Sequence, residues 1–346
     1  MSQHRVILVG AGDMGGHHAR AWAAVGQTIA AVVDPDVQRR AALAENYQVR
    51  ETFSDLEEAL ARCPDGDIVD VAVPLKHHAP LVIAAARRGR HVLVEKPVAR
   101  TLAEVDAMQD AVSRAGVVAA VGFQRNLSPG VAFLRDLVRQ NRFGRPLLFT
   151  AEGFAEIRPK RFMHDAEDNN GPLVDLLGHY FLLWESVFES QPERIYADGF
   201  VLAHDRPELQ QFAKKAIDTG TVVVRYASGD VATMTVSWGL SPKTRVPWVP
   251  ERLFGPNAVA IGGAFKDFTW EGFTIIEGDQ ETFHPLPLVN PFALQAQAFI
   301  EAVEGRRPAP PSTLEDGRRM LRLSLAALQS IATGEPVHLA LEPKEG

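Results

Sequence analysis

An aspartate and a histidine four residues apart, Asp175 and His179, are the side chains best suited to acid–base chemistry. On a helix, residues at i and i+4 lie on one face, so the carboxylate and the imidazole can approach one site. The carboxylate can orient the imidazole, and histidine exchanges protons near neutral pH. A lone histidine on an apolar helix more often packs or faces solvent, but the spacing from Asp175 favours the chemical role.

Lys96 is a second candidate, because it follows a predicted strand over residues 91–94 within the tripeptide Glu95-Lys96-Pro97. In open α/β sheets, ligands bind beyond the carboxyl ends of the strands. An ammonium group there can hydrogen-bond an oxygen that gains negative charge during a reaction. The tripeptide alone discriminates poorly, since a surface lysine before a turn-forming proline is ordinary.

A glycine-rich loop, Gly10-Ala11-Gly12-Asp13-Met14-Gly15, follows the apolar run at residues 6–9 and precedes a helical pattern. In such a loop the first glycine permits a tight turn, the second lets the backbone approach a pyrophosphate, and the third lets helix and strand pack closely. The helix N-terminus then offers free N–H groups to the phosphates. In this context the motif predicts a nicotinamide dinucleotide site. A Rossmann-like domain that binds another nucleotide, or none, is the alternative.

Asp34 ends the second predicted strand, 19 residues after Gly15. A carboxylate at this spacing accepts hydrogen bonds from the adenosine ribose and repels a 2′-phosphate, so NAD is favoured over NADP. Pro35 supports this preference, because NADP enzymes usually place a basic side chain there. Arg39 or Arg40, on the next helical segment, could partly substitute.

The first part of the chain alternates short apolar runs with alanine-rich helical patterns, which is typical of βαβ units and a parallel sheet. The expected strands cover residues 5–9, 29–34, 68–73, 91–94 and 117–121. The expected helices cover residues 17–25, 36–45, 56–61, 79–88 and 102–115. We therefore predict an α/β fold whose N-terminal domain, residues 1–123, is a doubly wound Rossmann parallel sheet.

The pattern changes after Gly122, where a helix over residues 129–140 precedes strands that mostly have no helix between them. These strands are expected at residues 147–155, 194–202, 221–226 and 231–238, and helices at 291–304 and 314–333 close the chain. We predict that residues 124–346 form a C-terminal α+β domain with a large, mostly antiparallel open sheet.

Composition excludes several classes of protein. The net charge of −7 and the pI near 5.9 argue against general affinity for nucleic acid or an anionic membrane. No apolar stretch approaches the roughly 20 residues needed to span a bilayer, and the apolar run near the N-terminus is too short for a signal peptide. Cys63 is the single cysteine, so no intrachain disulfide can form. We expect a soluble, cytoplasmic protein.

Residues 71–78, an alanine-rich helix and residues 89–97 together resemble the Gfo/Idh/MocA family, which includes glucose-fructose oxidoreductase and inositol 2-dehydrogenase. The segment Gly122-Phe123-Gln124-Arg125-Asn126 is similar to that family's strand end and first crossover. Residues 171–179 are similar to its glycine-rich helix start with an aspartate and a histidine four apart. The resemblance covers nearly the whole chain and is most specific over residues 1–184.

The resemblance implies an NAD(P)-dependent dehydrogenase that transfers hydride between the nicotinamide and a secondary hydroxyl or ketone of a polyol, sugar or sugar derivative. It implies that His179 is the base, that Asp175 orients it, and that Lys96 polarises the reacting oxygen. Members of the family can carry a cis bond before the proline, so we expect one at Lys96-Pro97. The expected cofactor contacts are Gly10, Gly12, Asp13, Met14, Gly15, Asp34, Val73, Pro74, His78, Glu95, Lys96 and Gln124.

Two positions depart from the family pattern. Leu75 stands where an asparagine is common, which removes an amide hydrogen bond at that point. The glycine run that usually precedes the aspartate is reduced to Asn170-Gly171-Pro172, which alters the backbone ahead of Asp175. The resemblance therefore does not identify the sugar.

Substrate contacts are expected in the polar segment at residues 158–170, because loops usually carry specificity. The candidates are Arg125, Asn126, Arg158, Arg161, His164 and Asn170, with Lys160, Asp168, Asn169, Arg245 and Trp248 as further polar or aromatic neighbours. If the basic side chains face the substrate, a carboxylated or phosphorylated sugar is the hypothesis. A solvated loop is the alternative.

No group of residues has convincing metal-ligand spacing, so no catalytic metal is predicted. Two other functions stay open: an NAD-dependent enzyme whose transient oxidation promotes glycoside cleavage or elimination, and a non-catalytic NAD(P)-sensing regulatory protein. The presence of Lys96, Asp175 and His179 together argues against the sensor. Because an open sheet face must be covered, and the family usually packs it against a partner's sheet, we expect a homodimer or homotetramer through the C-terminal sheet.

Overall fold

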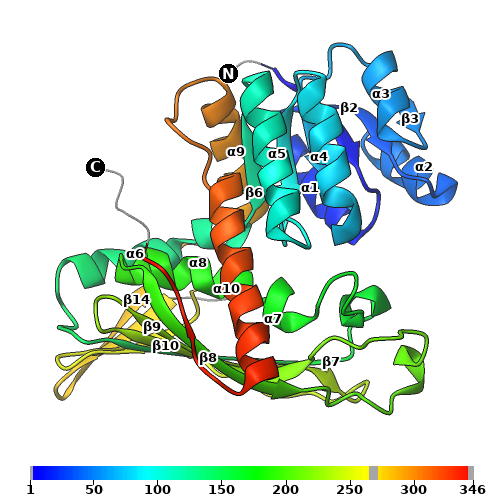
Figure 1. Ribbon diagram of the computed structural model, residues 1–346. Helices are drawn as coiled ribbons and strands as arrows, with labels where there is room; N and C mark the ends of the chain where they lie inside the picture. Colours follow the sequence, from blue (N-terminus) through cyan, green and yellow to red (C-terminus); the bar gives the residue numbers. More distant parts are fainter. Residues whose placement is uncertain (1–2, 265–271, 342–346) are drawn as a thin grey trace. The chain divides into compact units, whose positions relative to one another are not determined.

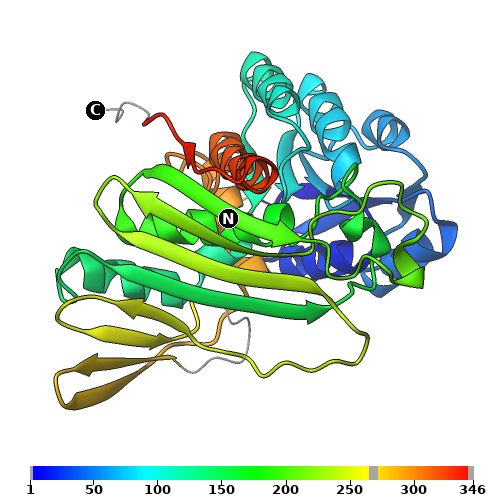
Figure 2. The same cartoon turned by 60° about the horizontal axis from the view of Figure 1, so that its bottom comes forward.

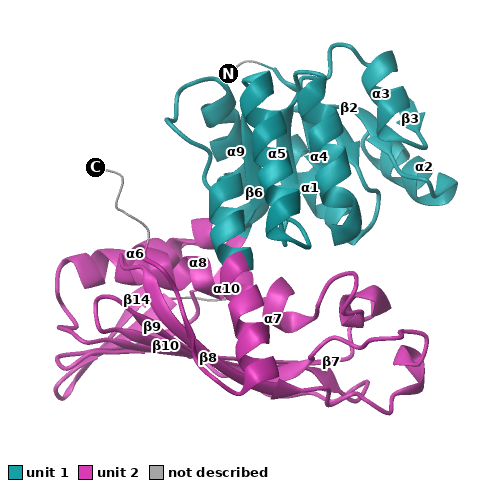
Figure 3. Ribbon diagram, in the orientation of Figure 1, with its two compact units in different colours: residues 1–124, 290–321 teal, residues 125–289, 322–346 magenta. Residues whose placement is uncertain are grey.

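The computed structural model describes residues 3–264 and 272–341, and the chain divides into two compact units (Figures 1 and 3). Unit 1 comprises residues 1–124 and 290–321, and unit 2 comprises residues 125–289 and 322–346. The first boundary lies one residue beyond the predicted one. The second domain was predicted to be continuous, whereas the structure assigns part of it, residues 290–321, to unit 1.

Unit 1 contains a six-stranded, fully parallel sheet in the order β3-β2-β1-β4-β5-β6. Its strands are β1 (Arg5–Val9), β2 (Thr28–Val33), β3 (Glu51–Phe53), β4 (Ile68–Val71), β5 (His91–Glu95) and β6 (Ala119–Gly122). This is the predicted doubly wound arrangement. Strand β3 was not predicted, because three residues carry too little periodicity to stand out.

Several helices of unit 1 begin at residues that cap them. Asp36, Asp55 and Thr101 each accept hydrogen bonds from backbone N–H groups of the helix that follows. Gly116, at φ +65°, ends α5 in the left-handed conformation that glycine favours. These helices are α1 (Asp13–Ala24), α2 (Val37–Asn46), α3 (Leu56–Arg62), α4 (His78–Arg87), α5 (Leu102–Ala115) and α9 (Pro291–Val303), with the 3-10 turns η1 (Leu75–His77) and η2 (Gln124–Leu127) at two strand ends.

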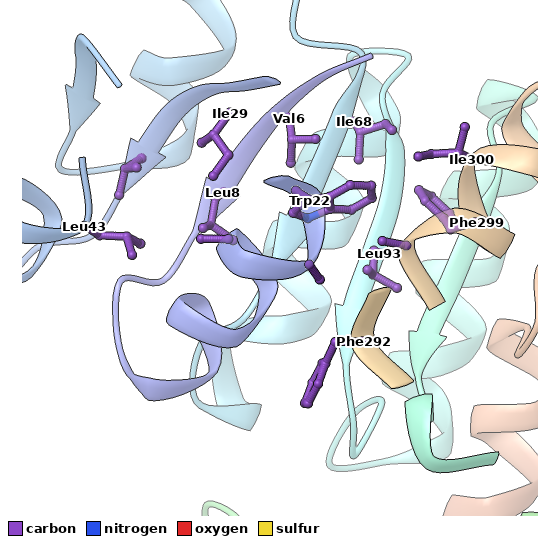
Figure 4. Packing of buried hydrophobic residues seen from close by; sticks show 14 of the residues in the cluster. Val6, Leu8, Trp22, Ile29, Leu43, Ile68, Leu93, Phe292, Phe299 and Ile300 are labelled. Carbon is purple, nitrogen blue, oxygen red and sulfur yellow. The ribbon is translucent and has the colours of Figure 1, made fainter. Parts of the chain in front are cut away.

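Helix α9 returns to unit 1 because its apolar side chains complete the core beside α1. Phe299 lies 6.4 Å from Trp22, centroid to centroid, and both are fully buried. Figure 4 shows Phe292, Phe299 and Ile300 in one cluster with side chains of the parallel strands. A linear reading of the sequence cannot detect such a return, so the predicted domain boundary missed it.

Unit 2 contains a nine-stranded sheet in the order β14-β13-β12-β11-β7-β10-β9-β8-β15. Every neighbouring pair is antiparallel except β7 and β10, so the sheet is mostly antiparallel, as predicted. Its strands are β7 (Leu148–Glu156), β8 (Pro192–Phe200), β9 (Thr219–Tyr226), β10 (Val231–Leu240), β11 (Glu251–Phe254), β12 (Val259–Gly262), β13 (Gly272–Glu277), β14 (Gln280–Pro285) and β15 (Val337–His338). Strands β11 to β15 were not predicted.

Among the described residues of unit 2, helices lie over one face of this sheet. Figure 1 shows α6 (Pro129–Arg139) and α8 (Leu177–Phe188) on one face, and Figure 2 turns the opposite face forward, over which no helix of unit 2 is described. Burial alternates strictly along β9, as a sheet with one solvent-facing side requires. The remaining helical segments are α7 (Pro172–Asp175), the turns η3 (Arg161–His164) and η4 (Pro207–Leu209), and α10 (Leu314–Thr333), which belongs to unit 2 from Arg322 onward.

The helix expected to carry Asp175 and His179 is interrupted between them. Asp175 ends α7, Leu176 is a turn residue, and His179 lies in the first turn of α8. Leu176 keeps right-handed helical angles, so the interruption is local. Among residues 3–264 and 272–341, no helix has both the length and the apolar character that crossing a bilayer requires.

Candidate active site

In the glycine loop, Gly10 and Gly15 pack closely against the protein's own backbone, whereas Gly12 does not. An added Cβ at Gly10 would lie 2.3 Å from the Ala72 carbonyl oxygen, and one at Gly15 would lie 1.9 Å from the Gly10 carbonyl oxygen. Gly10 also has φ +104°, which favours glycine. A Cβ at Gly12 meets no described atom within 4 Å. The first and third glycines therefore fit the protein, while the second leaves the room that a closely approaching pyrophosphate needs.

Helix α1 begins within this motif, at Asp13. Its N-cap is Gly12, which has no side chain to cap the N–H groups of the first turn. Such a helix start presents N–H donors and the positive end of the helix dipole, the combination that binds phosphate. The residues present thus fit the pyrophosphate of a dinucleotide.

Asp34 lies at the carboxyl end of β2 and is held by two backbone donors. Its Oδ2 accepts a hydrogen bond from Ala11 N at 2.8 Å, and its Oδ1 accepts one from Asp36 N at 2.8 Å. A carboxylate has about four acceptor sites, so capacity is left for ribose hydroxyls. Arg40 donates to the carbonyl oxygen of Asp34 at 2.9 Å, which keeps its guanidinium close to this carboxylate.

His78 holds together two strand ends that were both predicted to contact the cofactor. Its ring nitrogens each lie 2.9 Å from a carbonyl oxygen, Nδ1 from that of Pro97 and Nε2 from that of Val73. The ring is buried, and burial lowers the pKa of His78. A neutral ring carries one N–H, so it donates to one of these two carbonyls, and the contact of His78 with the cofactor stays a prediction.

Lys96 follows β5 and is partly exposed, and its peptide bond to Pro97 is cis, which confirms the expectation. Its backbone N–H donates to Glu95 Oε2 at 3.2 Å. Glu95 itself is buried and points into unit 1. Gln124, after β6, is buried too, and its Oε1 has no hydrogen-bond partner among the described residues.

In unit 2, Asp175 and His179 are both buried and each is fixed by an asparagine. Asn169 Nδ2 donates to Asp175 Oδ2 at 3.0 Å, and Asn126 Nδ2 donates to the His179 carbonyl oxygen at 3.2 Å. The Oδ1 atoms of both asparagines are buried and have no hydrogen-bond partner among the described residues. Buried polar atoms of this kind usually bind water or a ligand.

The chain enters α7 through two consecutive residues with positive φ, Asn170 at 66° and Gly171 at 71°. Asparagine tolerates this region better than other non-glycine residues. A Cβ at Gly171 would lie 2.7 Å from the Ile217 carbonyl oxygen, so the glycine is needed there. The shortened glycine run therefore still delivers the turn that leads into Asp175.

The basic segment ahead of this turn packs largely on itself. The Arg158 guanidinium lies over the Trp238 ring, 5.4 Å from its centroid, and Arg161 donates to the Arg158 carbonyl oxygen at 2.9 Å. His164 is buried and accepts from Arg158 N at 3.0 Å. Burial lowers the pKa of His164, as do the charges of Arg161 and Arg158, against an opposing effect of Asp218.

The structure brings the predicted residues together in two groups, one within each unit. The strand ends of unit 1 carry the predicted cofactor set, because the carboxyl ends of parallel strands lie at one edge of the sheet. Unit 2 carries Asp175, His179 and Asn126, and Arg125 begins this unit. Within residues 3–264 and 272–341, no group of three or more His, Cys, Asp or Glu side chains is placed to hold a metal ion.

Sequence reasoning missed three residues of these groups. Asn169 was named among the polar residues of the substrate segment, and its hydrogen bond to Asp175 was not predicted. The contacts of His18 with Asp70 and with Glu95 were not predicted. A charged residue inside the otherwise apolar strand β4 was the available signal, because a buried carboxylate needs a partner.

Comparison with known proteins agrees with this arrangement. Residues 4–123 match the oxidoreductase family with an NAD-binding Rossmann fold, and residues 131–253 match the GFO/IDH/MocA C-terminal domain. The chain belongs to the Gfo/Idh/MocA oxidoreductase family. The predicted family, fold class, oxidoreductase activity and NAD cofactor are confirmed at this level.

Individual relatives span nearly the whole chain. Myo-inositol 2-dehydrogenase of Thermotoga maritima is 26% identical over 97% of this chain and 98% of its own. The 4-carboxy-2-hydroxymuconate-6-semialdehyde dehydrogenase of a Sphingobium species is 31% identical over 88% of this chain and 92% of its own. The crystal structure of the WlbA dehydrogenase of Bordetella pertussis, in complex with NADH and UDP-GlcNAcA, has a TM-score of 0.79 at 23% identity and covers 99% of this chain and 100% of its own.

Proposed function

We propose that this NAD-dependent oxidoreductase transfers hydride between the nicotinamide and a secondary hydroxyl or ketone of a polyol, sugar or sugar derivative. The observation that carries the proposal is the presence of Lys96, Asp175 and His179 in a chain that matches the family in both of its domains. Relatives named as dehydrogenases of myo-inositol and of UDP-N-acetylglucosamine support this substrate class.

In the proposed reaction His179 accepts the hydroxyl proton as the carbinol carbon loses hydride. Asp175, fixed by Asn169, orients the imidazole and stabilises its charged form. The Lys96 ammonium donates a hydrogen bond to the substrate oxygen as negative charge develops. Bound NAD supplies the hydride acceptor. In the reverse direction the same groups protonate the developing alkoxide.

The glycine loop, Asp34 and the strand ends of unit 1 hold the cofactor in this proposal, and residues 125–289 carry the substrate contacts. The candidates Arg158, Arg161, His164 and Asn170 belong to that second set. Because two guanidinium groups lie in this segment, acidic sugars are included among the substrates to test. Unchanged KM for an acidic substrate after Arg158→Ala and Arg161→Ala would remove these residues from the substrate site.

The deciding experiment is a screen of inositols, aldoses, uronic acids and sugar phosphates for NADH or NADPH formation. We expect NAD-dependent turnover of at least one compound, and we expect Lys96→Ala and His179→Ala to lower kcat by about 1,000-fold. Glycoside cleavage or elimination without net NADH would instead indicate the recycling enzyme. A protein that binds NADH but shows no turnover sensitive to these two substitutions would be a sensor.

We also propose that the chain forms a homodimer or homotetramer through the helix-free face of the unit 2 sheet. Leu148, Tyr196 and Val223 are exposed apolar residues on three of its strands, and Tyr196 and Val223 are register partners. Open apolar sheet faces are usually covered by a partner. Val223→Glu should shift the mass measured by light scattering to that of a smaller species, while Val37→Glu, an exposed apolar site of unit 1, should not.

A cytoplasmic location is proposed on the single cysteine, Cys63, which is buried and free. Chains without disulfides are typical of reducing compartments. Cell fractionation of the expressed protein tests this directly.

A further inference from the structure

Unit 1 buries a cluster of three ionisable side chains beneath the Lys96 strand end. His18 of α1, Asp70 of β4 and Glu95 of β5 are exposed by 2%, 0% and 4%. His18 Nδ1 lies 2.9 and 2.8 Å from the two carboxylate oxygens of Asp70, and its Nε2 lies 3.0 Å from Glu95 Oε1. We call these three residues the His18 cluster.

The geometry favours an imidazolium at His18. Each ring nitrogen faces a carboxyl oxygen, and an ionised carboxylate only accepts, so two ionised partners call for two N–H donors. Burial alone lowers the pKa of His18, but the charges and hydrogen bonds of Asp70 and Glu95 outweigh it and raise the pKa to about 10. The cluster therefore holds one cation between two anions.

Further donors complete the cluster. Trp22 Nε1 donates to Asp70 Oδ2 at 2.5 Å, and the backbone N–H of Lys96 donates to Glu95 Oε2. Phe292 of α9 covers the His18 ring with its centroid 5.6 Å away. Fully satisfied buried charges of this kind are rigid, whereas removal of one partner leaves an uncompensated charge.

The position of Glu95 is also fixed from the opposite side. An added Cβ at Gly122, the last residue of β6, would lie 2.6 Å from Glu95 Oε1. The Glu95 carboxylate thus fills the space that a side chain at residue 122 would take. One of its oxygens faces His18 and the other accepts from the Lys96 backbone, so its position sets that of the Lys96 main chain.

We infer that His18 is a positioning residue for catalysis: through Glu95 it fixes the strand end that presents Lys96. This inference rests on the proposed role of Lys96. His18 does not touch the reacting atoms in this account, and Asp70 serves to hold the imidazolium. A group that is misplaced by about 1 Å can lose on the order of 100-fold in rate, which sets the size of the expected effect.

The test is a double-mutant cycle between His18→Gln and Lys96→Ala, with kcat, KM and the Kd for NADH measured for each protein. Glutamine offers one NH2 donor group and one acceptor oxygen in place of two ring N–H donors, so Glu95 or Asp70 loses its donor. We expect His18→Gln to lower kcat about 100-fold with the Kd for NADH changed less than about threefold. In the Lys96→Ala background the same substitution should lower the residual kcat by less than about threefold, because Lys96 transmits the effect.

His4→Gln is the matched control. His4 is also a buried histidine that pairs with a carboxylate, Asp67, but it precedes β1 at the opposite end of the strands from Lys96. Its substitution should lower the Tm and leave kcat unchanged. Gly122→Ala provides a second variant if His18→Gln does not fold, because it displaces the Glu95 carboxylate without removing a charge, and it should lower kcat with little change in NADH affinity.

The outcomes separate the inference from the proposed function. If the wild type turns over a sugar and Lys96→Ala abolishes this, but His18→Gln and Gly122→Ala keep normal kcat, the inference is overturned and the function stands. Equal losses from His18→Gln in the wild-type and Lys96→Ala backgrounds also overturn it, because they indicate a general loss of structure. If the wild type turns over no CH–OH substrate, the function fails and the inference falls with it.

Discussion

Two buried polar groups, one in each unit, differ in how their polar atoms are satisfied. In unit 1 every ring nitrogen and carboxylate of the His18 cluster has a protein partner. In unit 2 Asn126 Oδ1 and Asn169 Oδ1 are buried and have none among the described residues, although the same two side chains hold His179 and Asp175. The ionic cluster of unit 1 is thus satisfied within its own unit, while Asn126 and Asn169, like Gln124 at the end of unit 1, keep buried oxygens for water or a ligand.

The largest expected effect concerns the stability of unit 1 against pH. The pKa of His18 is raised to about 10 from 6.5. Its contribution to stability is therefore fully present below pH 6.5 and is lost as the pH rises through 10. At about 1.4 kcal/mol per pKa unit, the free energy of unfolding should fall by on the order of 4 kcal/mol over this window.

Urea unfolding at pH 6.5, 8 and 9.5 measures this loss, with His18→Gln as the control. The variant should be less stable at pH 6.5 and its stability should depend less on pH. If the free energy of unfolding falls equally with pH in both proteins, the imidazolium does not stabilise unit 1. The comparison of the two units would then be contradicted.

Gly12→Ala tests whether the open side of the glycine loop serves a ligand. No described atom lies within 4 Å of the added Cβ, so the substitution should cost less than about 1 kcal/mol of stability. It should raise the Kd for NADH about 100-fold, which is about 2.7 kcal/mol, because the methyl group occupies the space of the pyrophosphate.

Gly16→Ala is the matched control, since its added Cβ is equally unobstructed but lies one turn into α1. It should leave the Kd for NADH unchanged and stabilise the helix slightly. NADH binding by Gly12→Ala with wild-type affinity would contradict the assignment of this loop to the pyrophosphate.

The sequence predicted unit 1 well because its signals are local. Buried parallel strands are continuous apolar runs, and Asp36, Asp55 and Thr101 mark helix starts. The fit of α9 beside Trp22 depends on contacts between residues almost 280 positions apart, which no local pattern records. Strands β11 to β14 are only four to six residues long, and glycine or proline stands at an end of three of them, so they were not predicted either.

The site was predicted in part for the same reason. Gly12, Asp34 and Lys96 follow directly from strand ends, where position along the chain fixes position on the sheet edge. Other pairings depend on side-chain contacts in the folded chain. Examples are the contact of Asp70 with His18 and that of Asn169 with Asp175. The break at Leu176 between Asp175 and His179 was likewise invisible to spacing alone.

Asn169→Ala should affect the substrate side alone. It removes the hydrogen bond to Asp175 and should lower kcat/KM about 30-fold, or about 2 kcal/mol, while the Kd for NADH is unchanged. Ser330→Ala is the matched control, because it also removes a buried hydrogen bond of unit 2, to Ala197 N at 2.9 Å. The control should lose stability and keep wild-type kcat/KM. Equal kcat/KM in the two variants would show that the hydrogen bond from Asn169 to Asp175 does not support catalysis.

The smallest expected effect concerns the choice between NAD and NADP, and it tests whether the Asp34 carboxylate decides this choice. Asp34 accepts from Ala11 N and Asp36 N, which fix its carboxylate at the end of β2, and in the proposed cofactor site this charge repels a 2′-phosphate. Asp34→Asn removes that charge and should narrow the ratio of the Kd for NADPH to the Kd for NADH about tenfold. Arg40 donates to the Asp34 carbonyl oxygen and is the nearby cation that could then bind the phosphate.

Adding Arg40→Ala to Asp34→Asn should therefore weaken NADPH binding about threefold and leave NADH binding unchanged, a difference typical of one partly exposed charge pair. Fluorescence titration of wild type, both single variants and the double variant with NADH and NADPH measures these Kd values. If Arg40→Ala alone weakens NADH as strongly as NADPH, Arg40 acts by holding the end of β2, and cofactor choice rests on Asp34 alone. If Asp34→Asn leaves the ratio unchanged, the carboxylate serves the glycine loop through Ala11 and does not read the ribose.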